Sequence, residues 1–340
     1  MRWRFHDATR FAEFDADWRA LHAAGPASPL LDADFMAALL AAFGSAAELL
    51  ACCEHEGVTV AMALLERGRA GTWRSFQPAQ APIGPWLTHP DANLAALMAA
   101  LVRDLPGPMP ALLAGISQLD PLLDPRPPDD ARLATLDYID TARITIAGEF
   151  DAYWAARGKN LRSNLKKQRA RLAREGILTV CEEIRDPQAM AEAVAQYAAL
   201  ESGGWKGRGD TAVRTGDAQS RFYTLLLEAF ARRGAARVLR YRFDNDVVAM
   251  DLCIESPDCI VVLKTAYDEQ VPAHFSPAML MREEACRALF AEARLARIEF
   301  YGRVMEWHLR WTDEVRSLYH LNHYRWPLLK RLHAPRTSLE

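Results

Sequence analysis

The sequence predicts an α/β (α+β) fold made of two tandem mixed-sheet domains with helices on both faces. The chain has 340 residues, more than one domain of about 150 residues. The same order of elements also occurs twice: two helices, three antiparallel strands, a loop, a helix and a strand, with a right-handed crossover as the middle connection. The expected domains are residues 1–130 and 131–340. Leu119 to Asp130, with four prolines and four aspartates, is interpreted as the linker.

Apolar spacing and turn residues predict the elements of the first half. Glu56-Gly57 is the expected turn of a hairpin, and a loop rich in proline and glycine precedes the third helix. In chain order we expect helices 11–24 and 33–43, strands 48–55, 58–67 and 71–76, helix 92–104 and strand 111–117.

The second half repeats this order with longer elements. We expect strand 142–147, one long helix 149–175, strand 177–183, helices 187–201 and 218–233, strands 236–243, 247–254 and 259–267, helix 276–293 and strand 297–301. A further strand and helix are expected over 315–326. The repeat concerns architecture only, because the two halves show no visible sequence identity.

Composition argues for a reduced, cytoplasmic protein of ordinary enzyme size. Forty-one basic and forty-four acidic residues leave a net charge of −3, which disfavours a chain built to coat nucleic acid or anionic membrane. Apolar stretches such as Phe35–Phe43 are too short for a spanning helix of about 20 residues, and residues 1–7 lack a signal-peptide core. Six cysteines without a Cys-x-x-Cys pair are typical of free thiols. Neither membrane insertion nor an oligomeric state is indicated.

The first candidate site is the strand–loop–helix around residues 264–293. Ser276 is a good N-cap and Pro277 suits the first helical position. A helix start that follows a central strand offers amide groups and positive dipole to a phosphate. The alternative is a well-capped surface helix, because no glycine-rich nucleotide motif is present.

The second candidate is the basic helix. Its cations are Arg157, Lys159, Arg162, Lys166, Lys167, Arg169, Arg171 and Arg174. Leu161, Leu165 and Leu172 form the stripe that faces the core. The remaining surface is either a solvated face or a binding face for a phosphate, an acidic glycan or RNA.

The third candidate is the segment 201–211, in which four glycines surround Trp205, Lys206 and Arg208. An aromatic platform with two cations on a glycine-rich loop suits closure over a substrate or phosphorylated cofactor. We therefore prefer a functional interpretation over that of a plain linker.

Charged residues also interrupt the apolar runs of predicted strands. Asp251, Lys264 and Glu299 are of this kind, and central strands rarely carry charge without a partner. Either Asp251 and Lys264 form a structural ion pair, or a desolvated carboxylate acts as general base. No cluster of His or Cys at metal-ligand spacing is present, so no metal is expected.

Several of these segments together resemble a known family. They are Leu161-Arg162-Ser163-Asn164-Leu165-Lys166-Lys167-Gln168-Arg169-Ala170-Arg171-Leu172, Gly204-Trp205-Lys206-Gly207-Arg208, Lys264-Thr265-Ala266-Tyr267-Asp268, Phe275-Ser276-Pro277 and Ile298-Glu299-Phe300. In this order they resemble bacterial CelD/BcsL-type acetyltransferases of the GNAT superfamily, which are similar to Fem-type transferases with tandem GNAT folds. The resemblance covers about residues 140 to 325 and extends to the first half in architecture only.

The resemblance implies an acyl-CoA-dependent N-acyltransferase, with acetyl-CoA or another acyl-CoA as donor and an amine or amino-sugar as acceptor. The acceptor is a small molecule or is linked to a carrier, and transfer is direct, within a ternary complex. The donor maps onto 261–280, with its thioester where the strand 259–267 splays from 297–301. The implied cofactor-binding residues are Lys264, Thr265, Phe275, Ser276 and Ala278.

The roles of the other site residues follow from the same resemblance. Asp251 or Glu299 is the expected base, and His308 the expected proton donor to the thiolate, with Tyr267 as a second candidate. The implied substrate-binding residues are Trp205, Lys206, Arg208 and Arg162. The chain departs from the superfamily at 270–276, where the usual glycine-containing pyrophosphate loop is absent.

Two other functions fit the same segments. One is a Fem-like transferase that takes its acyl group from aminoacyl-tRNA, which the missing glycine loop and the basic helix favour. The other is a non-catalytic GNAT scaffold that serves binding in envelope-polysaccharide biosynthesis.

Overall fold

The computed structural model describes residues 1–203, 213, 214 and 216–333. The chain forms two compact units: unit 1 is Met1–Asp140 together with the segment from Ser317 onward, and unit 2 is Thr141–Arg316. The domains expected from the sequence, 1–130 and 131–340, are each one continuous segment of the chain. The compact units instead place the segment from Ser317 with the first half.

Unit 1 is a mixed sheet with strand order β1-β2-β3-β4-β6-β13, in which β5 also pairs with β3. Only β4 and β6 run parallel among the pairs described here. The strands are β1 Arg2–Asp7, β2 Leu49–His55, β3 Val58–Arg67, β4 Thr72–Ser75, β5 Trp86–Thr88, β6 Leu113–Leu119 and β13 Val315–Tyr324. The α-helices are α1 Asp15–Ala24, α2 Ala33–Phe43, α3 Leu94–Asp104 and α10 Pro327–His333.

Most elements predicted for the first half are present with small shifts, and two strands were missed. The turn at Glu56-Gly57 has φ of 52° and 82°, as a tight hairpin between right-twisted strands requires. The missed strands are β1 and β5. β1 carries charge at alternate positions and buries Trp3, 3 % exposed, with Phe5 partly buried beside it, so its apolar signal was two residues only.

The strands of unit 2 follow the order β7-β12-β11-β10-β9-β8, and β7 begins in unit 1 and enters unit 2 at Thr141. Its strands are β7 Leu133–Thr145, β8 Thr179–Ile184, β9 Ala236–Phe243, β10 Asp246–Glu255, β11 Cys259–Tyr267 and β12 Arg297–Phe300. Its helices are α4 Phe150–Ala155, α5 Lys159–Arg174, α6 Met190–Gly203, α7 Ala218–Ala231, α8 Pro277–Glu292 and α9 Glu306–Leu309. As expected, β11 and β12 run parallel.

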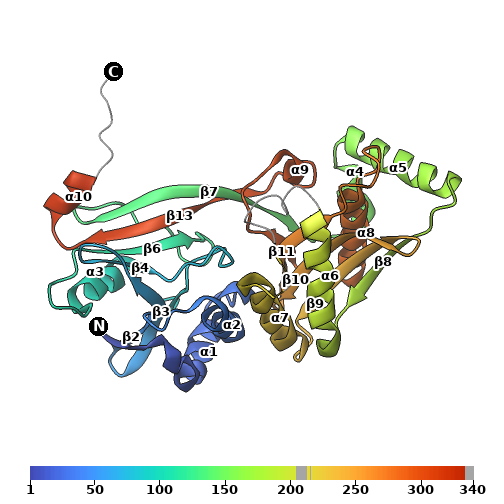
Figure 1. Cartoon of the computed structure of the whole chain (residues 1–340). Coiled ribbons are helices and arrows are strands. Elements are labelled where there is room, and N and C mark those ends of the chain that lie inside the picture. The colour runs from blue at the N-terminus through green and yellow to red at the C-terminus, as the bar shows by residue number, and fades with distance from the viewer. Residues whose placement is uncertain (204–212, 215, 334–340) are drawn as a thin grey trace. The chain divides into compact units, whose positions relative to one another are not determined.

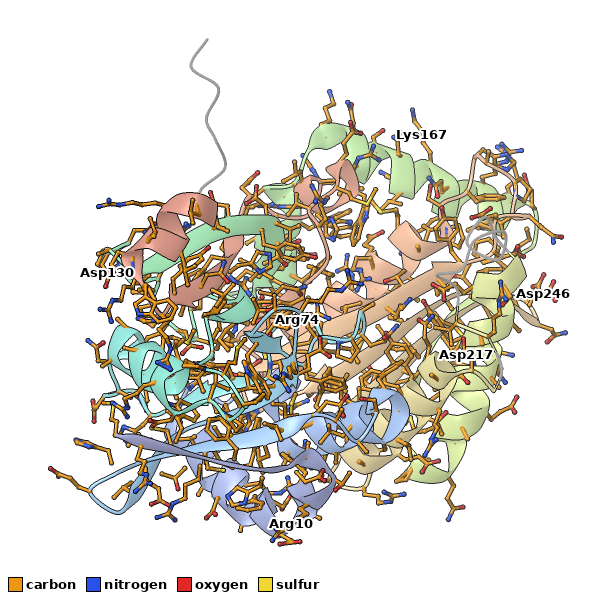
Figure 2. All side chains as sticks on the ribbon, turned by 60° about the vertical axis from the view of Figure 1, so that its left-hand side comes forward. Arg10, Arg74, Asp130, Lys167, Asp217 and Asp246 are labelled. Carbon is orange, nitrogen blue, oxygen red and sulfur yellow. The ribbon has the colours of Figure 1, made fainter. Side chains whose placement is uncertain are left out.

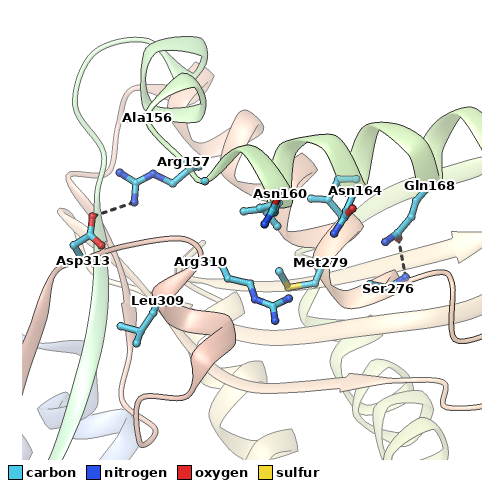
Figure 3. Close-up of a pocket in the computed structure, with 13 residues that line it drawn as sticks. Ala156, Arg157, Asn160, Asn164, Gln168, Ser276, Met279, Leu309, Arg310 and Asp313 are labelled. Carbon is cyan, nitrogen blue, oxygen red and sulfur yellow. Dashed lines mark hydrogen bonds and ion pairs between the residues drawn. The ribbon is translucent and has the colours of Figure 1, made fainter.

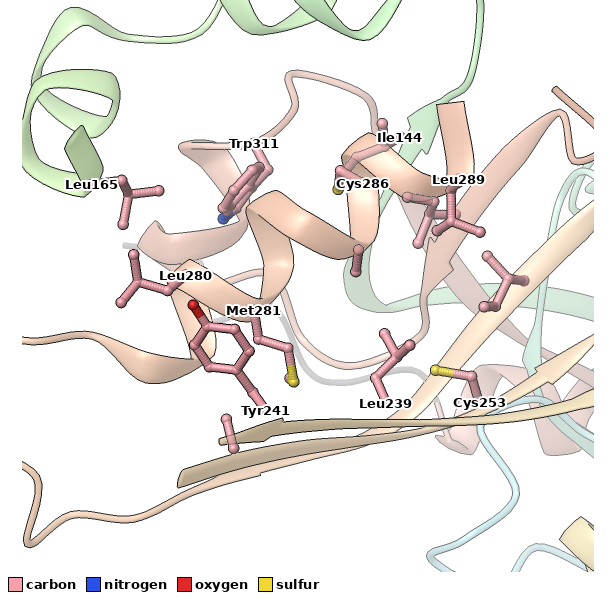
Figure 4. Close-up of a cluster of buried hydrophobic side chains, with 14 of the residues drawn as sticks. Ile144, Leu165, Leu239, Tyr241, Cys253, Leu280, Met281, Cys286, Leu289 and Trp311 are labelled. Carbon is pink, nitrogen blue, oxygen red and sulfur yellow. The ribbon is translucent and has the colours of Figure 1, made fainter. Parts of the chain in front are cut away.

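Helices cover both faces of the unit 2 sheet. Strand side chains alternate between the faces, so Leu239 and Tyr241 of β9 reach one core with Leu280 and Met281 of α8 (Figure 4). On the other face α6 and α7 pack against the central strands (Figure 1). The predicted fold class, mixed sheets with helices on both faces, is confirmed for this unit.

The prediction of one long helix over 149–175 was wrong in one respect. The segment consists of two helices, α4 and α5, because Gly158 leaves the helical region with φ −54° and ψ 134°. The aromatic side chains of α4 turn inward: Trp154 stacks on Phe150 and on Trp311, with ring centroids 5.8 and 5.5 Å apart. The corner between α4 and α5 shapes the pocket described below.

Within the part of the chain that the structure describes, no helix is both long and apolar enough to cross a bilayer.

Candidate functional site

The parallel strands of unit 2 form a fork. β11 and β12 pair over three positions only, from Cys259↔Arg297 to Val261↔Glu299. β11 then continues to Tyr267, while β12 ends at Phe300. Beyond Val261 the edge of β11 that faced β12 therefore has no paired strand among the described residues. Backbone N–H and C=O groups on such an edge are available to a ligand.

A bulge lies at the start of this open edge. Leu252 of β10 pairs with Lys264, and its neighbour Cys253 pairs with Val262. Leu263 is therefore an extra residue on β11, and bulges re-aim side chains and interrupt the ladder. The expectation that β11 splays from its parallel neighbour agrees with this geometry.

A buried ion pair lies beside the fork. Asp251 of β10 is fully buried, and its Oδ2 lies 2.7 Å from Nη1 of Arg282 of α8. The contact is an ion pair without the alignment of a hydrogen bond. The Thr265 hydroxyl donates to Asp251 Oδ1 at 2.5 Å and accepts from Arg282 Nη2 at 3.2 Å.

Burial and charge act in opposite directions on this pair. Burial raises the pKa of the Asp251 carboxyl, against the opposing effect of Arg282 and Thr265. Burial alone would lower the pKa of Arg282, yet the adjacent carboxylate raises it. The guanidinium is thus charged at any physiological pH, and Asp251 has no exposed surface through which to meet a substrate amine.

His308 joins the same cluster from α9. Its ring lies 5.5 Å from the ring of Phe300, and the Arg282 guanidinium lies 5.1 Å from that ring. His308 Nδ1 accepts a hydrogen bond from the Met305 amide at 3.0 Å. Burial, assisted by the charge of Arg282, lowers the pKa of His308 to about 4. The imidazole is therefore neutral at pH 7, with its proton on Nε2.

Two other charged strand residues lie in separate clusters. Glu299 is buried and contacts Arg297 at 3.0 Å and Arg316 at 2.9 Å. The expected Asp251–Lys264 ion pair is wrong: Lys264 Nζ lies 3.6 Å from Glu201 Oε1 of α6. The bulge explains this, because it places Thr265, rather than Lys264, opposite Asp251.

The start of α8 is occupied by the protein itself. The Ser276 amide donates to Gln168 Oε1 of α5 at 2.8 Å, and Ser276 makes no side-chain cap. Phe275 is buried, with its ring 5.9 Å from that of Phe243. Ala278 packs on the core of the unit. Of the predicted cofactor-binding residues in this segment, only Ser276 borders an open space.

That space is a pocket of about 620 Å³ between α5, the start of α8 and the end of α9 (Figure 3). Asn160, Asn164 and Gln168 line it as one stripe of α5, and Arg310 and Met279 lie opposite them (Figure 3). The full lining is Ala156, Arg157, Gly158, Asn160, Leu161, Asn164, Leu165, Gln168, Ser276, Met279, Leu309, Arg310 and Asp313.

The predicted substrate-binding residues are not gathered there. Arg162 donates from Nε to the Arg157 carbonyl at 3.0 Å and does not line the pocket. Trp205, Lys206 and Arg208 lie outside the described residues. Tyr267, at the end of β11, is 45 % exposed, which distinguishes it from the three buried acid–base candidates.

Unit 1 has a parallel pair too, but its fork is closed by the chain. β4 and β6 pair as far as Arg74↔Gly115. Beyond this point the Ser117 amide donates to Ser75 Oγ at 3.0 Å. The Gly84 amide donates to the Gln118 carbonyl at 3.3 Å. A ligand between these strands would have to displace the protein's own contacts.

Sequence reasoning missed Arg282 altogether, and it included Gln168 only within the segment 161–172 that resembles the family, without a role of its own. Arg282 stands at helical spacing from Ala285, Cys286 and Leu289, all buried, so its place on an apolar stripe was a detectable signal. The sequence signal for Gln168 was weaker: this residue continues the four-residue spacing of Asn160 and Asn164. No group of acidic, His or Cys side chains suited to a metal ion occurs among the residues that the structure describes.

Comparison with solved structures shows a shared fold. FemX is 10 % identical, with a TM-score of 0.59, covering 98 % of this chain and 100 % of that one. A conserved protein of unknown function from Bacteroides thetaiotaomicron is 12 % identical, with a TM-score of 0.59 over 94 % and 99 % of the two chains. The C-terminal domain of a putative lysylphosphatidylglycerol synthetase from Agrobacterium fabrum is 13 % identical, with a TM-score of 0.55 over 92 % of each.

In the sequence comparison, one family model matches part of unit 2. No curated protein matches the chain. Residues 159–309, however, match the model of the acetyltransferase (GNAT) domain. The match begins at α5 and ends at α9, so it includes the fork, the Asp251–Arg282 pair and most of the pocket lining.

Proposed function

We propose that unit 2 is an N-acyltransferase that moves an acyl group, acetyl in the simplest case, from a thioester to an amine or amino-sugar. The observation that carries this proposal is the open fork between β11 and β12, within the segment that matches the acetyltransferase domain. Free backbone groups there can polarise the carbonyl of a thioester held in the fork. The closed fork of unit 1 supports one site per chain.

The step is a direct transfer in a ternary complex. The amine nitrogen attacks the thioester carbonyl carbon, the new C–N bond forms, and the C–S bond breaks. The amine loses one proton and the leaving thiolate gains one. Holding both reactants in one fork supplies most of the rate enhancement, because it makes the step effectively unimolecular.

Among the four acid–base candidates, exposure favours Tyr267. Asp251 and Glu299 are buried in ion pairs, and His308 is buried with a pKa near 4. We assign Tyr267 as the proton donor to the thiolate. Asp251, Thr265 and Arg282 hold α8 against the sheet beside the reacting groups.

The donor's nucleotide fits less well than its thioester. A diphosphate needs several free amides at a helix start. Here the Ser276 amide is taken by Gln168, Pro277 has none, and the Met279 and Leu280 amides bond to the Ser276 carbonyl at 2.9 and 3.0 Å. Of the amides in the first turn of α8, that of Ala278 alone bonds to neither Gln168 nor the Ser276 carbonyl.

The test is a thiol-release assay with acetyl-CoA, longer acyl-CoAs and acetyl-pantetheine against a panel of amines and amino-sugars. Amine-dependent thiol release is expected, and Tyr267→Phe should lower kcat by about 10²-fold. Tyr138→Phe, at an exposed tyrosine of unit 1, is the matched control. No transfer from any thioester would refute the proposal.

A second function, transfer from aminoacyl-tRNA, is favoured by four cations of α5 that form no ion pair with any residue the structure describes: Lys159, Lys166, Lys167 and Arg174. RNA binding through such a face should weaken steeply with salt. Filter binding of aminoacyl-tRNA between 50 and 200 mM salt tests it. Absent or salt-insensitive binding would rule it out.

A further inference from the structure

The carboxamide side chains of the pocket beside the start of α8 suit an uncharged ligand chain that carries amide groups. Asn160, Asn164 and Gln168 follow one another at four-residue spacing, about 6 Å per step along the helix axis. Each carboxamide offers both donor and acceptor atoms. Asn160 and Asn164 are exposed to the pocket.

The other lining residues suit the apolar groups and the terminal phosphate of such a ligand. Leu161, Leu165, Met279 and Leu309 supply apolar contacts. Arg310, exposed on the opposite wall (Figure 3), can bind one phosphate group. A phosphopantetheine arm has two amides, a hydroxyl, methyl groups and a terminal phosphate, and so matches the wall group by group.

The start of α8 does not supply the free amides that a second phosphate would need. The helix start that would take a diphosphate is closed by Gln168 and Pro277. An arm with a single phosphate satisfies the site, whereas the nucleotide half of coenzyme A does not.

The outer face of α5 indicates what carries the arm. Lys159, Lys166, Lys167 and Arg174 are exposed, and within the described part of the chain none of them forms an ion pair. Nearby acids are already used: Glu283 and Glu284 bind Arg169, and Glu175 binds Arg171. Figure 2 shows Lys167 extending outward from the helix.

Helical geometry places this basic face next to the amide stripe. Lys167 precedes Gln168 by one residue and follows Asn164 by three, so it lies at the edge of the stripe. A partner bound on α5 through negative charges would therefore stand at the pocket mouth.

RNA is less suited than an acidic protein to this face. Non-specific RNA binding usually adds aromatic side chains that stack on bases. The nearest one, Trp154, is packed between Phe150 and Trp311. No aromatic residue lies within α5 itself.

We propose that the acyl donor is a phosphopantetheine thioester carried by a small acidic carrier protein, which docks on Lys159, Lys166, Lys167 and Arg174 and places its arm along Asn160, Asn164 and Gln168. This rests on the proposed acyl transfer. The amine displaces the thiol, which leaves on the carrier's arm with the proton that the thiolate gains.

The experiment compares one acetyl group on three donors: a holo acyl carrier protein, coenzyme A and free pantetheine. The carrier thioester should give a kcat/KM about tenfold or more above the other two at low salt. Replacing the four cations of α5 together by Glu should remove that advantage and leave turnover of acetyl-pantetheine unchanged. The control replaces four exposed arginines elsewhere by Glu: Arg67, Arg69, Arg132 and Arg221.

Each outcome decides one point. Failure of all three thioesters refutes the acyltransferase itself. Equal turnover of the carrier and coenzyme A thioesters, unaffected by the α5 substitutions, overturns the carrier proposal alone. Loss of tRNA binding in the α5 variant, with carrier turnover unchanged, overturns it in favour of RNA.

Discussion

Asp251 Oδ2 and Arg282 Nη1 lie 2.7 Å apart between a central strand and the helix that covers it, and both side chains are at most 5 % exposed. Such a pair gains little over an apolar replacement, but each partner alone is costly to leave buried. The pair therefore ties α8 to β10 in a single arrangement beside the fork.

We expect Arg282→Met to lower the free energy of unfolding by about 3–5 kcal/mol, because it leaves the Asp251 carboxylate buried without its cation. The double variant Asp251→Leu with Arg282→Met should recover a large part of that loss. Urea unfolding of the two single variants and the double variant measures the coupling energy. Additive losses would contradict a coupled pair.

The closed fork of unit 1 predicts a sharp response at Gly84. A Cβ there would lie 2.4 Å from the Ser117 carbonyl oxygen, so Gly84→Ala must displace a strand that pairs in the sheet. We expect a loss of about 2 kcal/mol or more in the stability of unit 1. Gly158→Ala is the control, because no atom lies within 4 Å of its Cβ position. Thermal unfolding that shifts equally for both variants would count against this packing.

Unit 1 also contains a carboxyl group that should make its stability depend on pH. Asp124 is 6 % exposed, and burial raises its pKa to about 6 although the Thr88 hydroxyl donates to it at 2.7 Å. The folded form binds the proton more tightly than the unfolded form, so stability falls as pH rises from about 4 to 6. The change should be about 3 kcal/mol.

The matching variant is Asp124→Asn, which keeps an acceptor for Thr88 and cannot ionise. Its stability relative to the natural protein should rise between pH 4 and pH 6.5, measured as the difference in urea midpoint. A pH-independent difference would show that Asp124 ionises without a folding cost.

The sequence predicted those parts of the fold that depend on local patterns. β11 was predicted with both its ends, and the hairpin at Glu56-Gly57 with its turn. β11 begins with the apolar run 259–263, and the hairpin turn contains Gly57, which tolerates positive φ. The break at Gly158 was missed because the leucine stripe of α5 begins only three residues later, and one glycine within a helical pattern is a weak signal.

The candidate site was only partly predictable, because its contacts join residues far apart in the chain. Asp251 was recognised as an unusual strand residue and Thr265 as a cofactor-binding residue implied by the resemblance, yet the bulge that pairs them moves the register by one residue. The Ser276–Gln168 contact joins positions 108 residues apart. Local patterns identify unusual residues, whereas their partners depend on tertiary packing.

His308 predicts a pH dependence of the opposite sign in unit 2. Burial lowers its pKa from 6.5 to about 4, so the unfolded form binds the proton more tightly. Stability should therefore rise as pH increases from about 4 to 6.5 and then level off. The change is about 3 kcal/mol, and His308→Asn should remove it. A variant that retains the full pH dependence would show that another group causes it.

The contact between Gln168 and Ser276 predicts a gain of binding on mutation. Gln168→Ala frees the Ser276 amide, which then points at the place where a helix start attracts phosphate. A hydrogen bond to a charged group contributes about 1.5–3 kcal/mol, more than the about 0.5–1.5 kcal/mol of the neutral contact that the Gln168 carboxamide would make with the arm, so calorimetry should show coenzyme A binding about fivefold tighter than to the natural protein.

Gln168→Glu is the control for that gain. It keeps an oxygen acceptor for the Ser276 amide and adds a negative charge beside the expected phosphate position, so coenzyme A should bind no better than to the natural protein. If both variants gain affinity, the effect comes from a wider pocket. If neither gains, the start of α8 is not a phosphate site in any state of Gln168, and the donor must then be recognised entirely through its pantetheine arm and whatever carries it.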